Sequence, residues 1–143
     1  MKEEIEALFD RYTREFNNAV AGQPNMDALA DQYSEAFIGA APAGVMVSKN
    51  DDDFKKSMSA GFDYQRKIGT RQMRLRGIRI HPIDGLHALA TVDWTAVYEA
   101  KGETKTIDFV NDYLVRVVDG TAKVFGWITG DEQAEMKKHG IIE

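Results

Sequence analysis

The sequence predicts an α+β fold in which helices cover one face of a single antiparallel sheet. Apolar residues recur at helical spacing through the first half of the chain, and strict alternation replaces that spacing for about sixty residues after Gly69. Helices followed by a run of strands are typical of this class, because each helix stripe and sheet face must be buried against another layer. A chain of 143 residues has the length of one domain, so we expect residues 1–143 to share one core.

Three helices are expected before the sheet. The first covers residues 2–21, and a short second helix runs from Met26 to Tyr33 with Asn25 as its cap. A third helix starts at the acidic run 51–53, and we expect Ser48 or Asn50 to cap it. Its spacing predicts a buried stripe of Phe54, Met58, Gly61, Phe62, Gln65 and Ile68.

The strands follow from alternation and from turn residues. A small hairpin is expected in EAFIGAAPAGVMV, and later strands cover 71–80, 86–100, 104–118 and 122–129. The turns PIDG, AKGE and VDGT contain glycine, which favours sequential antiparallel hairpins. A short final helix is capped by Asp131 and stops at Gly140.

The apolar pattern of strand 71–80 predicts an irregularity in its pairing. Met73 and Leu75 share one face of strand 71–80, whereas Ile78 and Ile80 have the opposite parity. An extra residue near Arg76 and Gly77 would turn all four apolar side chains inward, so we expect a β-bulge there. The bulge would also turn the arginines of RQMRLRGIR outward, which makes this basic run a solvated face.

Composition and charge exclude several functions. The formal charge of −5 argues against binding to nucleic acid or to an anionic membrane, which needs a clustered cationic surface. Without cysteine there is no disulfide, no thiolate nucleophile and no cysteine-based metal site. The start MKEEIEALFD does not resemble a signal peptide, and no apolar run is long enough to cross a membrane. We therefore expect a cytoplasmic protein without a metal or cofactor.

This order of elements resembles the nuclear transport factor 2-like superfamily, which includes ketosteroid-isomerase-like and polyketide-cyclase-like proteins. The stretches that resemble it are FDRYTREF, ALADQYSEAFIGAAP, YLVRVVDGTAKVFGW and ITGDEQAEMKKHGII, the last being similar to endings of uncharacterised bacterial members. The resemblance covers essentially the whole chain. It implies a cone of three N-terminal helices on a strongly curved, mixed or antiparallel sheet, followed by a short C-terminal helix.

The resemblance also implies a homodimer through the outer face of the sheet. On this chain that face would present Thr91, Asp93, Thr95, Val97, Val110 and Leu114. These residues mix apolar patches with charges that neighbouring strands can pair. Asp93, Asp108 and Asp112 should meet Arg74, Arg76 and Arg116 there.

The isomerases of this superfamily use a carboxylate base and two donors that stabilise an oxyanion. Tyr12 matches the first donor, and Tyr113 falls at the second. The base falls on Ala41 of GAAP, which cannot take a proton, so the resemblance does not extend to steroid-isomerase chemistry. Dehydratase-like members use inward histidine and aspartate, whereas all three histidines of this chain are expected at the surface.

A pocket is predicted by IDFVNDYLVRVVDG, which places Asn111 and Tyr113 on the same face as Phe109 and Val115. Phe125 and the other inward aromatic residues of the sheet should continue this face. The predicted ligand-binding set is Tyr12, Phe37, Met58, Phe62, Trp94, Tyr98, Asn111, Tyr113 and Trp127. A fully packed core is the alternative for each of them, but a buried amide is hard to satisfy between strands, so Asn111 is the best marker of a cavity.

Two classes of function remain open from the sequence. The favoured class is a protein that binds a small, largely apolar molecule in a central cavity, with lyase or isomerase activity left open and no catalytic residue assigned. The alternative is a non-catalytic interaction module that uses the sheet face or the C-terminal helix. Ligand binding to the native state alone would raise the melting temperature and so separate the two.

Overall fold

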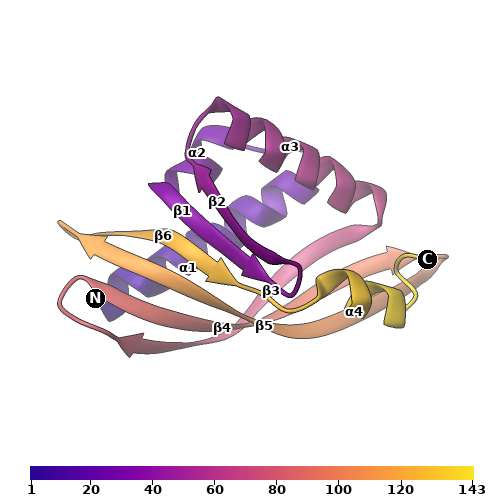
Figure 1. Cartoon of the computed structure of the whole chain (residues 1–143). Coiled ribbons are helices and arrows are strands. Elements are labelled where there is room, and N and C mark those ends of the chain that lie inside the picture. The colour runs from indigo at the N-terminus through magenta and orange to yellow at the C-terminus, as the bar shows by residue number, and fades with distance from the viewer.

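The computed structural model describes all 143 residues and shows the predicted α+β architecture (Figure 1). The helices are α1 (Lys2–Val20), α2 (Met26–Asp31), α3 (Asp52–Lys67) and α4 (Glu132–Lys138). The strands are β1 (Tyr33–Ala41), β2 (Gly44–Lys49), β3 (Thr70–Pro82), β4 (His87–Ala100), β5 (Glu103–Val118) and β6 (Thr121–Ile128). No helix combines the length and the apolar composition that a membrane span requires.

The six strands form one mixed sheet in the order β2-β1-β6-β5-β4-β3. Four neighbouring pairs are the antiparallel hairpins that the turn residues predicted. The fifth pair, β1 with β6, is parallel and joins the first hairpin to the far end of the meander. That long-range pair has no signal in the local sequence, because a parallel neighbour is not linked to its partner by a short turn.

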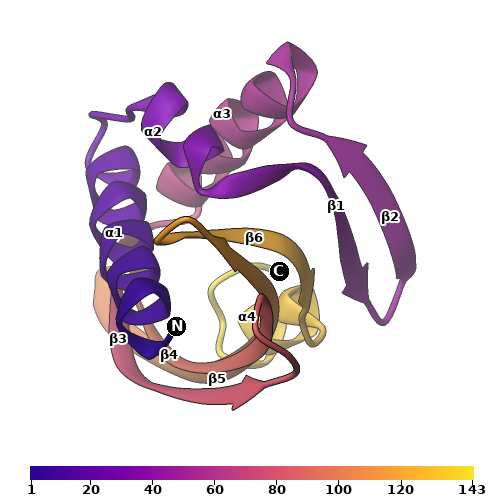
Figure 2. The ribbon, with the colours of Figure 1, turned by 90° about the vertical axis from the view of Figure 1, so that its left-hand side faces the viewer.

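Helix α1 forms the main contact between the helical layer and the sheet. Its buried residues Ile5, Leu8 and Phe9 lie in one core cluster with residues of β4, β5 and β6. At its other end Asn17 bonds the backbone of Met73 twice, donating to the carbonyl at 3.0 Å and accepting from the amide at 2.8 Å. The end-on view shows α1 and α4 on the same side of the strands (Figure 2).

Two bulges set which residues of the sheet face inward. The expected bulge in β3 is confirmed, since the register shifts between Leu75 and Gly77 and both apolar pairs of this strand pack on the core. A second bulge lies in β6, where the pairing with β5 shifts by one residue. It buries Val124 and turns Phe125 outward, onto His87, so the predicted inward position of Phe125 is wrong.

The region around α3 differs from its prediction in three details. Asp51 caps the helix by accepting from the Phe54 amide at 2.9 Å, so neither Ser48 nor Asn50 is the cap. Asn50 instead donates to carbonyls at the end of α2 and the start of β1. Tyr33 begins β1 rather than ending α2, and no residue of α3 is fully buried, although most of its predicted stripe is half-buried.

Candidate functional site

A cavity of about 240 Å³ lies between α1, the end of α3, strands β3–β5 and α4. Its wall is mostly apolar and rich in aromatic rings. The lining residues are Tyr12, Phe16, Gln65, Met73, Trp94, Tyr98, Ile107, Phe109, Val110, Asn111, Tyr113, Gly130, Asp131, Glu132, Glu135 and Met136. The structure therefore brings together five members of the predicted set, namely Tyr12, Trp94, Tyr98, Asn111 and Tyr113.

Three other predicted residues surround a second hollow, of about 410 Å³, under α3. Met58, Phe62 and Trp127 line it, and Tyr12, Phe16 and Gln65 line both this hollow and the main cavity. Gln32 also lines this hollow: it is 1% exposed, its amide nitrogen donates to the Leu29 carbonyl, and its Oε1 has no partner.

The last predicted residue, Phe37, lines neither space. It is 3% exposed, and its ring packs against Tyr33, Phe54 and Trp127 with centroids 5.5, 4.6 and 5.3 Å away. The alternative of a packed core therefore applies to this position. Trp127 reaches the Phe37 ring because Gly39 leaves room for it, since a Cβ at Gly39 would lie 2.8 Å from the indole.

Two polar side chains of the cavity wall converge on the hydroxyl of a third, Tyr113. The Trp94 Nε1–H donates to the Tyr113 hydroxyl at 3.1 Å, and the Asn111 Nδ2–H donates to it at 3.4 Å. Asn111 and Tyr113 point the same way because they are two residues apart on β5, and Trp94 lies on the adjacent strand β4. The ring of Tyr12 lies beside this network, 5.9 Å from that of Tyr113 between centroids.

Burial keeps the phenols of this network neutral. It raises the pKa of Tyr12 and of Tyr113 well above the usual 10.0. It likewise raises the pKa of Tyr33 and of Tyr98 to about 12. These hydroxyls can donate and accept hydrogen bonds near neutral pH, but they do not act as bases there.

The cavity contains a carboxyl group that the sequence did not reveal. Glu132 is the first residue of α4, directly after the capping Asp131, whose side chain accepts from the Ala134 amide at 2.9 Å. Glu132 lines the cavity and is also exposed at its rim. Burial raises the pKa of Glu132, and a polar contact with Asn111 opposes part of that rise.

The position of α4 over the cavity depends on apolar contacts at its far end. Met136 and Ile141 are buried in a cluster with Ala96, Tyr98 and Ile107. Lys105 also donates from Nζ to the His139 carbonyl at 3.0 Å. An acidic residue in the first turn of a short helix is ordinarily solvated. The position of Glu132 at the cavity therefore depends on the contacts that hold α4 in place.

Residues 2–132 match the family described as NTF2-like protein (DUF6841). The chain belongs to this NTF2-like family. No curated protein matches the sequence. The fold is similar to that of an NTF2-like protein with a cystatin-like fold from Novosphingobium aromaticivorans, with a TM-score of 0.66, 17% identity, and 99% of this chain and 88% of that chain covered.

Two further structures show how widely this NTF2-like fold is used. The beta subunit of the benzoate 1,2-dioxygenase from Burkholderia mallei matches with a TM-score of 0.67 and 12% identity, covering 92% of this chain and 91% of that one. A ketosteroid isomerase-like protein from Erwinia carotovora atroseptica matches with a TM-score of 0.59 and 16% identity, covering 90% and 93%. At such identities these likenesses show the fold alone, so function has to be argued from the cavity.

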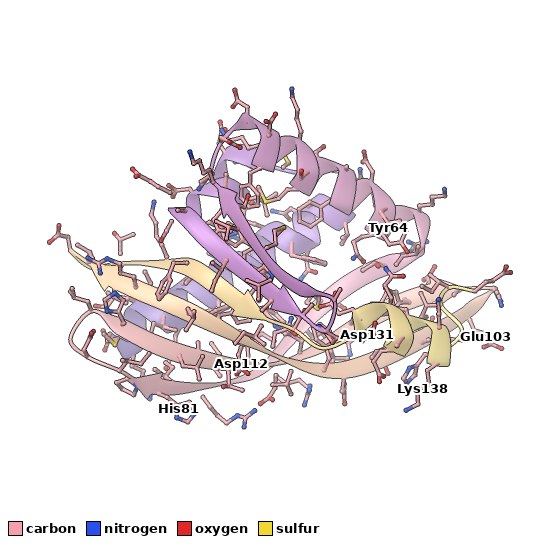
Figure 3. The ribbon with its side chains drawn as sticks, viewed as in Figure 1. Tyr64, His81, Glu103, Asp112, Asp131 and Lys138 are labelled. Carbon is pink, nitrogen blue, oxygen red and sulfur yellow. The ribbon has the colours of Figure 1, made fainter.

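The NTF2-like cavity has no carboxylate at the position that the resemblance assigned to the isomerase base. Ala41 ends β1 at an exposed turn. The aspartates of the central strands face the other way: Asp112 and Asp108 accept from Thr91 and Thr95, each at 2.6 Å. Figure 3 shows Asp112 and His81 on the side of the sheet away from the helices.

The outer face pairs its charges within the chain, although not all in the predicted combinations. Arg76 lies 3.8 Å from Asp108, within the expected set, whereas Asp93 pairs at 3.0 Å with Arg79, which was not among the expected partners. Arg116 contacts the ring of His87. The three histidines are exposed or half-buried and none lines the cavity, and no group of side chains forms a metal-binding cluster.

Proposed function

We propose that this NTF2-like protein binds a small, largely apolar molecule in the cavity between α1, β3–β5 and α4. The supporting observation is the convergence of Trp94 and Asn111 on the Tyr113 hydroxyl in a wall that is otherwise mostly apolar. A few fixed polar groups in a concave apolar wall are the usual composition of a ligand site, because the apolar area supplies affinity and the polar groups supply orientation.

The volume of the cavity limits the size of the ligand. At about 240 Å³ it exceeds the roughly 150 Å³ of an engineered apolar cavity that accepts benzene. It is smaller than the roughly 300–1,000 Å³ of pockets for drug-sized molecules. The ligand class that fits best is therefore a molecule with one ring, or an open chain of similar bulk.

A thermal-shift screen tests this proposal. We expect lactones, monoterpenoids, aryl alcohols or small amines to raise the melting temperature, since a ligand at a hundred times its Kd stabilises the native state by about 2.7 kcal/mol. Asn111→Leu should weaken that binding and leave the protein folded, and Tyr113→Phe should weaken it less. A panel in which no compound shifts the melting temperature of the wild-type protein would refute ligand binding in the cavity.

A matched pair of substitutions localises any binding. Met73 lines the cavity, whereas Met46 is 52% exposed on the β1–β2 hairpin. Met73→Phe adds bulk inside the cavity and should reduce the ligand-induced shift, while Met46→Phe should leave it unchanged. If both variants respond like the wild type, the ligand binds elsewhere.

A second candidate function, an interaction module, is favoured by the outer face of the sheet. The register places Val47, Ile38, Gly126, Leu114 and Leu89 side by side across five strands. Val47 is 78% and Ile38 is 39% exposed, and the side chains of Ile38 and Leu114 both come within 3.0 Å of where a Gly126 Cβ would lie. Such a continuous apolar row is suited to a protein partner, and we propose a second copy of the chain.

Light scattering tests the proposed homodimer. We expect a dimer at micromolar concentration, and Val47→Glu should shift it to a monomer because the charge would be desolvated at the interface. Ile83→Glu is the matched control, since Ile83 is 62% exposed in the β3–β4 turn and lies outside the row. A wild-type protein that stays monomeric at high micromolar concentration would contradict this proposal without affecting the cavity.

A further inference from the structure

The hydrogen bonds among Trp94, Tyr113 and Asn111 leave an acceptor, rather than a donor, of this cluster available to a ligand. The Tyr113 hydroxyl already accepts from both Trp94 and Asn111. The Asn111 amide nitrogen donates to Tyr113, and the amide oxygen Oδ1 accepts no hydrogen bond within the chain. Asn111 is only 8% exposed, so a ligand in the cavity could supply the missing partner. Glu132 forms no ion pair, and its carboxyl group adds further acceptor sites.

The charges around the cavity have one sign. Asp131, Glu132 and Glu135 line it at the α4 end, and none of the lining residues is lysine or arginine. The Asp131 carboxylate is occupied by the helix cap and Glu135 is exposed. Glu132 is therefore the carboxyl group that a bound molecule would meet, and an ammonium group would give it the cation partner that it lacks within the chain.

The remaining wall suits a cation with an apolar body. The rings of Tyr12, Trp94, Tyr98 and Phe109 line the same space, and Tyr12 lies 5.7 Å from Trp94 and 5.9 Å from Tyr113 between ring centroids. Aromatic faces attract ammonium groups, and the attraction strengthens where water is excluded. A carboxylate at one end of an aromatic cavity is the arrangement that recognises amines.

We propose that the ligand is a small organic amine whose ammonium group lies between the Glu132 carboxylate and Asn111 Oδ1, with its apolar part among the aromatic rings. This inference rests on the proposed function of the cavity and specifies the ligand class. Anionic molecules are disfavoured, because a carboxylate ligand would meet Glu132 and find no cation and no free donor from the Trp94–Tyr113–Asn111 cluster. The cluster therefore offers no free donor that could stabilise an oxyanion.

Three probes of similar shape and different charge test the inference. Isothermal titration calorimetry in phosphate buffer, which avoids amine buffers, would compare phenethylamine, phenethyl alcohol and hydrocinnamate near neutral pH. We expect the amine to bind roughly tenfold to a hundredfold tighter than the alcohol, the range of a hydrogen bond to a charged group, and hydrocinnamate to bind weakest.

Two substitutions assign the preference to one side chain. Glu132→Gln should bring the affinity for phenethylamine down to that for phenethyl alcohol while the affinity for the alcohol stays the same. Glu103→Gln removes an equal charge from an exposed residue that does not line the cavity and should leave the preference intact.

The outcomes separate this inference from the proposed function. If phenethyl alcohol or hydrocinnamate binds as tightly as the amine, the inference is wrong and the cavity is still a ligand site. If the preference for the amine survives in the Glu132→Gln protein, Glu132 does not recognise the ammonium and the inference is also wrong. If none of the three probes binds the wild-type protein, the inference is wrong, and the thermal-shift panel decides separately whether the cavity binds another ligand.

Discussion

The two long helices of the N-terminal half have similar amphipathic sequences but are packed very differently. Helix α1 buries Ile5 and Phe9 completely against the central strands, whereas α3 has no fully buried residue and stands over a hollow of about 410 Å³. Helix α1 packs on β3, β5 and β6 and shares one core cluster with inner residues of β4, while α3 packs mainly on the helices α2 and α1 and touches the sheet at β3. An amphipathic pattern indicates which face of a helix turns inward, and the surface opposite decides how closely that face is packed.

Equal substitutions in the two helices measure this difference. Phe9→Ala should cost about 3–5 kcal/mol of unfolding free energy, because the site is fully enclosed and a cavity would remain. Phe62→Ala should cost about half as much, since Phe62 is half-buried beside an existing hollow and packs mainly on Phe16 with centroids 5.3 Å apart. Urea denaturation of both variants measures the two losses. Equal losses would show that the α3 region is as tightly packed as the α1 region.

The joint between α3 and the sheet should be the most rigid part of the loosely packed region. Gly69 has φ +95°, and a Cβ there would lie 2.0 Å from the Glu99 carbonyl oxygen of β4. Gly69→Ala should therefore cost about 2–4 kcal/mol, from both the backbone conformation and the clash. Gly102→Ala is the control: its φ is +78° but nothing lies within 4 Å, so only the conformational cost of about 1 kcal/mol remains. Thermal unfolding would contradict this contrast if the two variants lost the same stability.

The hydrogen bonds from Trp94 and Asn111 to the Tyr113 hydroxyl should stabilise the folded protein. Tyr113→Phe leaves the buried Trp94 Nε1–H and the Asn111 amide without their acceptor, at a cost of about 1–3 kcal/mol. Tyr98→Phe removes a hydroxyl from the same cavity wall, but that hydroxyl has no hydrogen-bond partner within the chain, so the change should be nearly neutral. Similar denaturation midpoints for the two variants would mean that the network does not stabilise the fold.

The sequence predicted the sheet well because alternation is a local signal. The four strands of the meander, β3–β6, start and end within two residues of the predicted limits, and opposite parities within one strand located the β3 bulge. The β6 bulge was missed because Val124 and Phe125 are both apolar, so parity could not distinguish them. The parallel β1–β6 pair was missed because it depends on where distant strands meet.

The candidate site was predictable in part for the same reason. Asn111 and Tyr113 stood out as polar residues on an apolar strand face, and the structure places both in the cavity wall. Phe37 could not be separated from them, because an inward aromatic residue looks the same in the sequence whether it lines a cavity or fills a core. Glu132 gave no signal, since an acidic residue in a first helical turn is ordinarily solvated and its place over the cavity depends on the packing of Met136.

The smallest expected effect concerns Glu132, which lines the cavity of about 240 Å³ between α1, β3–β5 and α4. Its carboxyl titrates near the ordinary value of 4.5 in the unfolded chain and at a higher pKa in the folded protein, because burial disfavours the charged form. Between these values the folded state holds more protons than the unfolded state, so stability falls as pH rises through the window.

Glu132→Gln removes this penalty, so the variant should melt at a higher temperature than the wild type near neutral pH, in the absence of ligand. The difference should shrink as the pH falls through the window and vanish below about pH 4, where the wild-type carboxyl is protonated in both states. Glu103→Gln, the exposed control, should follow the wild-type curve throughout. A Glu132→Gln protein that is less stable than the wild type at neutral pH would mean that favourable contacts hold the carboxylate, and the cavity would then lack the uncompensated charge on which amine recognition depends.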